Sequence, residues 1–182
     1  MRFNDKRGFT LIEVIVVAGI IAILAGILVP MIFNQIDESR KTRALADCKS
    51  IQTAIMTFRK DTGVWPNRTN PTTANISMLS GGGTAIPDAD LGPLGFDVTT
   101  RQMYSDHLKT DNNLAYGASW KGPYLNKVEA DPWGNAYITN ALNFNDNPAT
   151  PVWILSAGPD GILQTATNGN NLSGDDVGIL IK

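Results

Sequence analysis

The sequence predicts an α+β protein in which one long N-terminal helix packs against a small antiparallel sheet with long loops. Two observations support this prediction. Apolar and helix-forming residues continue from residue 9 to residue 62, and short β-type runs separated by Gly, Pro, Asn and Asp follow in the rest of the 182-residue chain. Apolar residues make up 43% of the chain, which excludes a wholly disordered protein.

Composition excludes several classes of function. The formal net charge of −2 does not suit a basic nucleic-acid-binding surface, so we expect no direct nucleic-acid partner. Cys48 and His107 are the single cysteine and histidine, which excludes an internal disulfide and a zinc site with several Cys or His ligands. We expect Cys48 in the core and His107 in a surface loop. Residues 64–182 hold no clustered catalytic set, so we expect no enzymatic activity.

The predicted helix contains an apolar segment of membrane-spanning length. Every residue from Val14 to Phe33 is apolar, Gly or Pro, and about 20 such residues rise about 30 Å, the thickness of a hydrocarbon core. Arg2, Lys6 and Arg7 precede the segment and favour a cytoplasmic N-terminus, with the chain beyond the segment outside the cytoplasm. A cleaved signal peptide is the alternative, but the run exceeds a usual h-region and lacks a small-x-small site.

The helical period continues beyond the apolar segment. Between residues 34 and 62 the composition becomes polar, yet one apolar stripe persists. Gly63 is a helix stop, and Pro30 should kink or locally unwind a helix that is roughly 80 Å long. A lone membrane anchor needs no such extension, whereas a helix that packs against copies of itself does. The stripe comprises Ala44, Cys48, Ile51, Ile55 and Phe58.

Glu13 is an anomaly in this apolar helix. An ionised side chain in a membrane-spanning helix is unfavourable, so we expect it to have a partner. If the chain is cut after Gly8, a new amine appears, and a neighbouring helix shifted by one turn would bring its amine to this carboxylate. Snorkelling of Glu13 to the lipid head groups is the alternative.

Residues 63–182 predict a compact exported domain. Asn70 before a proline is typical of a helix start, so we predict a short helix over residues 70–79. Residues 84–119 are rich in Gly, Asp and Asn and predict a loop-rich insertion with a short helix near residues 105–108. Residues 131–135 form a strong turn sequence. Strands are predicted over residues 136–139, 152–155 and 177–181.

The residues around Gly8 resemble the type IV prepilin motif. Lys-Arg-Gly8 is followed by Phe-Thr-Leu-Ile-Glu13, and Pro30 lies within the apolar run. The resemblance implies a leader peptide over residues 1–8, cleavage between Gly8 and Phe9 by a prepilin peptidase, and methylation of the Phe9 amine. It also implies that Glu13 pairs with the Phe9 amine of an adjacent subunit during filament assembly.

Three motifs in the exported domain resemble the major pseudopilin of type II secretion. Trp-Lys-Gly-Pro-Tyr begins at residue 120, Asp-Pro-Trp-Gly-Asn-Ala-Tyr at residue 131 and Ser-Ala-Gly-Pro-Asp-Gly at residue 156. They occur in that family's order. The resemblance covers residues 1–66 and 120–182, whereas residues 84–119 and the loop over residues 162–174 are longer than is usual there.

The loop after the third motif is a candidate calcium site. Asp160, Asp175 and Asp176 would repel one another unless a cation joined them, and Ca2+ prefers carboxylate and carbonyl oxygens. Because the spacing matches no EF-hand, the residues alone leave a solvated acidic loop and a metal site equally open. The resemblance implies that these three residues bind Ca2+, with the carbonyl of Ala157 as a further ligand.

The resemblance implies a structural subunit of a type IV pilus-like filament. Residues 1–8 would be the leader, 9–33 the membrane and filament-core half of the helix, 34–62 its amphipathic half and 63–182 the exported globular domain. The subunit would leave the inner membrane for a helical homopolymer, the periplasmic pseudopilus that serves protein export. Its partners would be a prepilin peptidase, minor pseudopilins, an inner-membrane assembly platform and a cytoplasmic ATPase.

Two alternatives remain. One is a type IV pilin of a long extracellular fibre that serves adhesion, motility, DNA uptake or electron transfer. The other is a membrane-anchored binding domain or enzyme.

Overall fold

The structure, a computed structural model, comprises two compact units, Met1–Ser39 and Arg40–Lys182. Helix α1 (Leu11–Thr62) contributes to both. The predicted leader lies outside the described residues except for Gly8. The structure describes residues 8–70, 72–83, 86, 91–111, 116–145, 147 and 149–182.

The first unit contains the apolar half of α1. The helix continues through Pro30 without local unwinding. The large apolar side chains of residues 9–36 are all exposed, from 42% at Ile36 to 88% at Phe9. By length and composition the helix is able to cross a bilayer. Because so large an apolar surface is unstable in water, lipid or other protein chains must cover it.

In the second unit, α1 forms one side of the hydrophobic core. The helix ends at Thr62, where Gly63 adopts a φ of +74°, the left-handed conformation that glycine tolerates best. The predicted stripe faces the core, and every member of it is buried. Its members are Ala44, Cys48, Ile51, Ile55 and Phe58.

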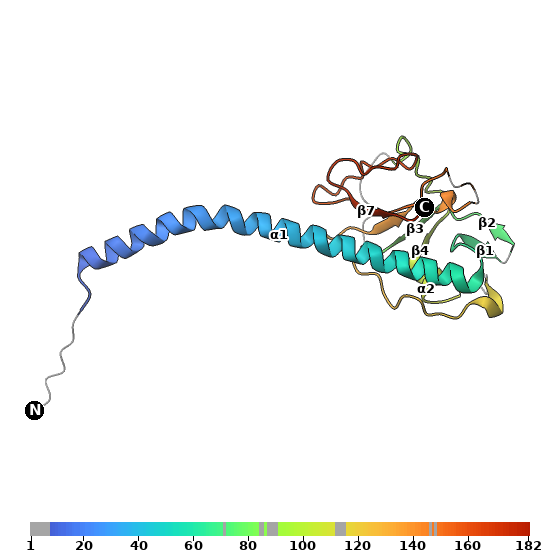
Figure 1. Cartoon of the computed structure of the whole chain (residues 1–182), viewed down its shortest axis with the longest axis horizontal. Coiled ribbons are helices and arrows are strands. Elements are labelled where there is room, and N and C mark those ends of the chain that lie inside the picture. Colours follow the sequence, from blue (N-terminus) through green and yellow to red (C-terminus); the bar gives the residue numbers. More distant parts are fainter. Residues whose placement is uncertain are drawn as a thin grey trace, which may run out of the picture. The chain divides into compact units, whose positions relative to one another are not determined.

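A five-stranded sheet packs against this part of the helix (Figure 1). The strand order is β4-β3-β5-β6-β7. All neighbours are antiparallel except β3 and β4, so the sheet is mixed and not wholly antiparallel as predicted. The connection between β3 and β4 brings the chain back to the end at which β3 begins. Strand β4 therefore runs parallel to β3. The strands are β3 (Met78–Gly81), β4 (Arg101–Met103), β5 (Tyr137–Thr139), β6 (Trp153–Ser156) and β7 (Val177–Leu180).

Short helical elements accompany the sheet in the part of the chain that the structure describes. Helix α2 (Tyr104–Leu108) follows β4 directly and confirms the helix predicted near residues 105–108. The 3-10 turns η2 (Gly117–Ser119) and η3 (Ala141–Asn143) lie in the connections. The strands predicted over residues 136–139, 152–155 and 177–181 are also confirmed, as β5, β6 and β7, within one residue at each end.

The predicted helix over residues 70–79 is wrong. The segment contains strand β2 (Thr73–Ala74), which pairs with β1 (Arg68–Asn70), and the first half of β3. The side-chain Oδ1 of Asn70 accepts the N–H groups of Thr72 at 3.1 Å and Thr73 at 2.8 Å, which is an Asx turn. The side chain expected to cap a helix closes a turn instead, and pairing of β3 on both edges overrides the local helix signal.

The other face of the sheet carries a second layer, built from the two segments that are longer than expected. Strand residues such as Met78 and Leu155 form a second apolar cluster with Phe96 and Leu163. Thr167 joins the two segments, because its N–H donates to the carbonyl of Leu94 at 2.8 Å and its hydroxyl to that of Gly95 at 3.1 Å. Residues 91–96 of the insertion and residues 163–167 therefore pack together on this face.

Candidate functional site

The N-terminal motif forms a capping box at the start of α1. The N–H and the hydroxyl of Thr10 each donate to Glu13 Oε2 at 2.8 Å, and the N–H of Glu13 donates to Thr10 Oγ1 at 3.3 Å. The Glu13 carboxylate is thus hydrogen-bonded within its own chain. Any amine that paired with Glu13 would have to compete with these bonds.

The predicted cleavage junction lies just before the helix. Phe9 is 88% exposed, and a side chain added at Gly8 would meet no atom within 4 Å. The bond between the two residues is therefore sterically open. Cleavage, methylation and the pairing of Glu13 with the Phe9 amine stay predictions.

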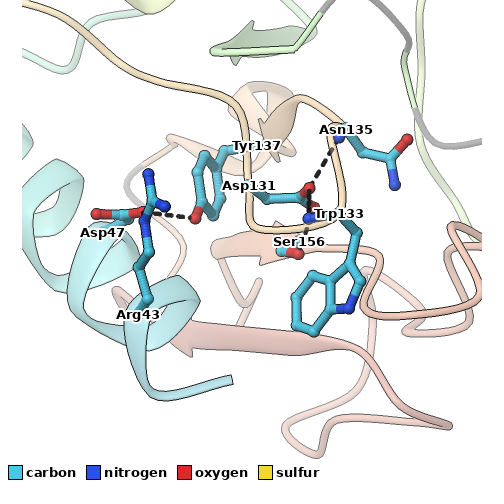
Figure 2. Close-up of polar contacts among 7 residues, drawn as sticks. All are labelled: Arg43, Asp47, Asp131, Trp133, Asn135, Tyr137 and Ser156. Atoms are coloured by element: carbon cyan, nitrogen blue, oxygen red, sulfur yellow. Dashed lines mark hydrogen bonds and ion pairs between the residues drawn. The ribbon is translucent and has the colours of Figure 1, made fainter. Parts of the chain in front are cut away.

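Two of the three motifs in the second unit meet at one buried carboxylate. Asp131 is 4% exposed, and its Oδ1 accepts the N–H groups of Trp133 at 3.0 Å and Asn135 at 2.8 Å (Figure 2). Its Oδ2 accepts the hydroxyl of Ser156 at 2.6 Å. Ser156 Oγ in turn accepts the N–H of Gly158 at 3.3 Å. The turn is thereby fastened to the end of β6, where the acidic loop begins.

A polar contact connects strand β5 to α1. The hydroxyl of Tyr137 donates to Asp47 Oδ2 at 2.9 Å, and the same oxygen lies 3.9 Å from Arg43 Nε (Figure 2). Burial and the neighbouring Asp47 carboxylate raise the pKa of Tyr137, so its phenol keeps the proton that it donates. The contact fixes one register between the helix and the sheet.

The acidic loop comprises residues 160–176. Hydrogen bonds connect its three aspartates, Asp160, Asp175 and Asp176, to its backbone. The N–H of Asp160 donates to Asp175 Oδ2 at 3.2 Å. Asp176 Oδ2 accepts the N–H groups of Gln164 at 2.9 Å and Thr165 at 2.7 Å. Ala157, the fourth predicted ligand, is buried in the second apolar cluster. Among the described residues, no group of three or more Asp, Glu, His or Cys side chains has the arrangement of a metal site.

Two carboxylate oxygens of this loop nevertheless lack a hydrogen bond. Asp175 Oδ1 and Asp176 Oδ1 are buried, and neither has a partner in the part of the chain that the structure describes. Burial, together with the charge of Asp175, raises the pKa of Asp176, which is 7% exposed. Buried acceptors without donors are the ligands that a hard cation takes, so these residues fit Ca2+.

The prediction that His107 lies in a surface loop is wrong. Its ring is fully buried in α2. The hydroxyl of Tyr116 accepts the N–H of Arg68 at 3.4 Å and shares a hydrogen bond of 2.7 Å with His107 Nδ1. Nε2 of the same ring has no partner within the described ranges. Burial lowers the pKa of His107 to about 4.

Sequence reasoning missed the hydrogen-bonding roles of Ser156 and Gln164. Ser156 belongs to a recognised motif, but nothing in the motif indicates that its hydroxyl binds Asp131. Gln164 belongs to no motif, and only the folded loop brings its side chain to the aspartates. Neither residue had a signal in the sequence beyond its polarity.

Two family profiles match the chain. The one described as Prokaryotic N-terminal methylation motif matches residues 3–29, which include the capping box. The one described as Type II secretion system (T2SS), protein G matches residues 100–174, which include the Asp131 turn and most of the acidic loop. This second match begins inside the insertion predicted over residues 84–119. No solved structure matches the chain significantly.

Relatives of known name are similar over most of the chain. Type II secretion system core protein G of Escherichia coli (strain K12) is 30% identical over 166 residues, which are 91% of this chain and 90% of that protein. The protein of the same name from Pseudomonas aeruginosa is 28% identical over 88% of this chain and 89% of its own length. Fimbrial protein Q of Moraxella bovis is 36% identical, but over only 45% of this chain and 54% of that protein. Because the similarity to the first relative covers nine-tenths of both chains, this chain belongs to the type II secretion system core protein G family.

Proposed function

We propose that this chain is the major pseudopilin of a type II secretion system, a structural subunit that assembles into a helical pseudopilus for protein export. The observation that carries the proposal is the similarity to core protein G along nine-tenths of the chain. The structure adds an apolar half-helix that is exposed on every side and therefore needs partners.

In this proposal the apolar half of α1 lies first in the membrane and then in the filament core. Before assembly, lipid of the inner membrane surrounds it, and the exported domain lies outside the cytoplasm. In the filament, neighbouring helices take the place of the lipid around the same side chains, so no large apolar surface meets water. Repeated heterologous contacts of this kind do not close and so produce a filament.

Glu13 directs docking in this proposal. A prepilin peptidase removes residues 1–8, and the amine of Phe9 becomes a cation that is then methylated. An incoming subunit exchanges the bonds between Glu13 and Thr10 for an ion pair with the Phe9 amine of its neighbour. Minor pseudopilins, an inner-membrane platform and a cytoplasmic ATPase complete the machine.

Substitution of Glu13 tests the pseudopilin proposal. We expect E13A to abolish assembly of the subunit in the cell envelope and to stop secretion, because the docking charge is lost. The control is E129A, which removes a carboxylate whose side chain is 59% exposed in the exported domain, and which should assemble normally. Mass spectrometry of the subunit should show methylated Phe9 as its first residue. Normal assembly of E13A, or an uncleaved chain in native filaments, would contradict the proposal.

A long surface fibre is the second candidate, because fimbrial protein Q matches about half of this chain. Electron microscopy of native cells distinguishes the two. Long fibres that contain this chain would favour a surface pilus. A mature chain that stays in the cell envelope without such fibres would favour the pseudopilus.

We further propose that the acidic loop binds Ca2+ through Asp160, Asp175, Asp176 and the carbonyl of Ala157. The support is the pair of buried carboxylate oxygens without donors. The cation would neutralise charges that otherwise repel and so hold the loop in one conformation. We expect Ca2+ to raise the unfolding temperature of the full chain in detergent relative to EDTA, with no rise for D175A/D176A. Identical melting curves of the unmodified chain in Ca2+ and in EDTA would contradict this.

A further inference from the structure

The hydroxyl of Ser156, the last residue of β6, makes two hydrogen bonds that lead towards the acidic loop. It donates to Asp131 Oδ2 at 2.6 Å and accepts the N–H of Gly158 at 3.3 Å, and both Ser156 and Asp131 are buried. A hydroxyl has a single proton, and here Asp131 receives it. The lone pairs of Ser156 Oγ are therefore left for the N–H of Gly158.

The bond to Gly158 fixes the direction of the peptide group that joins it to Ala157. A trans peptide group is planar, and its carbonyl and its N–H point in opposite directions. Because the N–H of Gly158 donates to Ser156 Oγ, the carbonyl of Ala157 points away from that hydroxyl. Turning the carbonyl would break the bond. This carbonyl is the backbone ligand of the proposed calcium site.

The same peptide group lies against the far end of the acidic loop. A Cβ added at Gly158 would overlap the backbone oxygen of Asp175, and the φ of Gly158 is +69°, which glycine tolerates best. The N–H of Asp160 donates to Asp175 Oδ2 at 3.2 Å. The side chain of Gln164 bridges the Asp160 carboxylate and the N–H of Asp175. The two ends of the loop therefore meet beside Gly158.

We propose that Asp131 and Ser156 are positioning residues for the proposed calcium site. They hold the carbonyl of Ala157 in one direction, next to Asp175, before the cation binds. Neither is itself a ligand. This inference rests on the calcium site proposed above, and it gives the turn over residues 131–135 a role in metal binding.

The size of the effect follows from preorganisation. A ligand that has to be ordered during binding lowers the affinity, whereas a ligand that is already held in place does not. Replacing a group that orients the ligands of a metal typically costs about 10- to 100-fold in affinity. Ser156 orients a neutral carbonyl and not a carboxylate, so we expect an effect at the lower end of this range.

Coupling between two sites is reciprocal, so the cation should also stabilise the turn. The N–H groups of Trp133 and Asn135 donate to Asp131 Oδ1, whereas Asp131 Oδ2 accepts the hydroxyl of Ser156. Ca2+ should therefore slow hydrogen exchange at these two amides, although neither belongs to the acidic loop. In this proposal Ser156 is the link that carries the effect.

The test compares S156A with S77A in the full chain in detergent. Ser77 is a matched control, because it is also buried and its hydroxyl accepts a backbone N–H, that of Thr100 in the insertion, at 3.1 Å. Calorimetry gives the affinity for Ca2+. Amide hydrogen exchange reports the protection of Trp133 and Asn135 in EDTA and in Ca2+.

We expect S156A to bind Ca2+ roughly tenfold more weakly than wild type, and S77A to bind it as tightly as wild type. Ca2+ should slow exchange at Trp133 and Asn135 in wild type and in S77A, but not in S156A. A purely structural role of Ser156 would lower the unfolding temperature and leave both the affinity and this protection unchanged.

Several results would overturn the inference. Wild-type affinity in S156A would show that Ser156 does not position the site, and equal losses of affinity in S156A and S77A would point to general destabilisation. Protection of Trp133 and Asn135 by Ca2+ in S156A would show that the coupling does not pass through the hydroxyl. If wild type binds no Ca2+, the calcium site and this inference both fall, whereas the assembly assay of E13A judges the pseudopilin function separately.

Discussion

At the scale of single residues, His107 couples stability to pH. The pKa of the buried ring is about 4 in the folded domain, against an ordinary value near 6.5 in the unfolded chain. Because the folded value is the lower one, acid protonates the unfolded chain first. The free energy of unfolding should therefore fall as the pH drops from about 6.5 towards 4, by at most about 3 kcal/mol from this residue.

Chemical denaturation at several pH values measures this effect. The control is H107Q, which offers Tyr116 an acceptor and does not titrate. Carboxylates elsewhere affect both proteins alike, so the difference between the two curves isolates the histidine. Parallel curves from pH 7 to pH 4 would contradict the assignment of a neutral, buried ring.

Asp131 should be costly to replace. D131A removes an acceptor of three hydrogen bonds and leaves the part-buried N–H groups of Trp133 and Asn135 and the buried hydroxyl of Ser156 without it, so we expect a loss of about 3 kcal/mol. S156A removes one of these bonds and should cost about 1 kcal/mol. Urea denaturation of both variants checks the order, and a smaller loss for D131A than for S156A would contradict the network.

At the scale of elements, the buried stripe of α1 should dominate the stability of the second unit. The ring of Phe58 lies 4.7 Å from that of Tyr116 and 5.5 Å from that of Tyr124, so F58A should cost about 3–5 kcal/mol. Met56 lies on the same helix but is 46% exposed, and M56A should change stability by less than about 0.5 kcal/mol. Equal losses for the two variants, measured by urea denaturation, would contradict this packing.

Elements whose signal is local were predictable, and elements that depend on pairing were not. Helix α1 follows from its period alone, because each residue of the stripe meets neighbours three or four positions away. Asn70 shows the limit. Its side chain accepts backbone N–H groups equally well in a helix cap and in an Asx turn. Only the pairing of β1 with β2 and of β3 with β5 decides between them.

At the scale of the whole molecule, assembly and folding should be separable. The hydrogen bonds of Glu13 are with Thr10, whereas Phe58 packs in the core of the second unit. We therefore expect E13A to lose filaments while its unfolding temperature in detergent stays unchanged. F58A should melt at a lower temperature, as measured by circular dichroism. An equal drop in melting temperature for both variants would contradict the separation.

Residue patterns alone were sufficient to predict the apolar half-helix, the buried stripe and three of the strands. The resemblance to the prepilin family added the predicted processing motif and the role of Glu13. Each depends on residues close together in the chain, whose spacing sets what one helix face or strand presents. Only the tertiary structure decided the parallel pairing of β3 with β4, the burial of His107, the bond from Asp131 to Ser156 and the bridge made by Gln164. These contacts join residues of separate segments, and the path of the chain through the sheet, which no local spacing encodes, determines which segments meet.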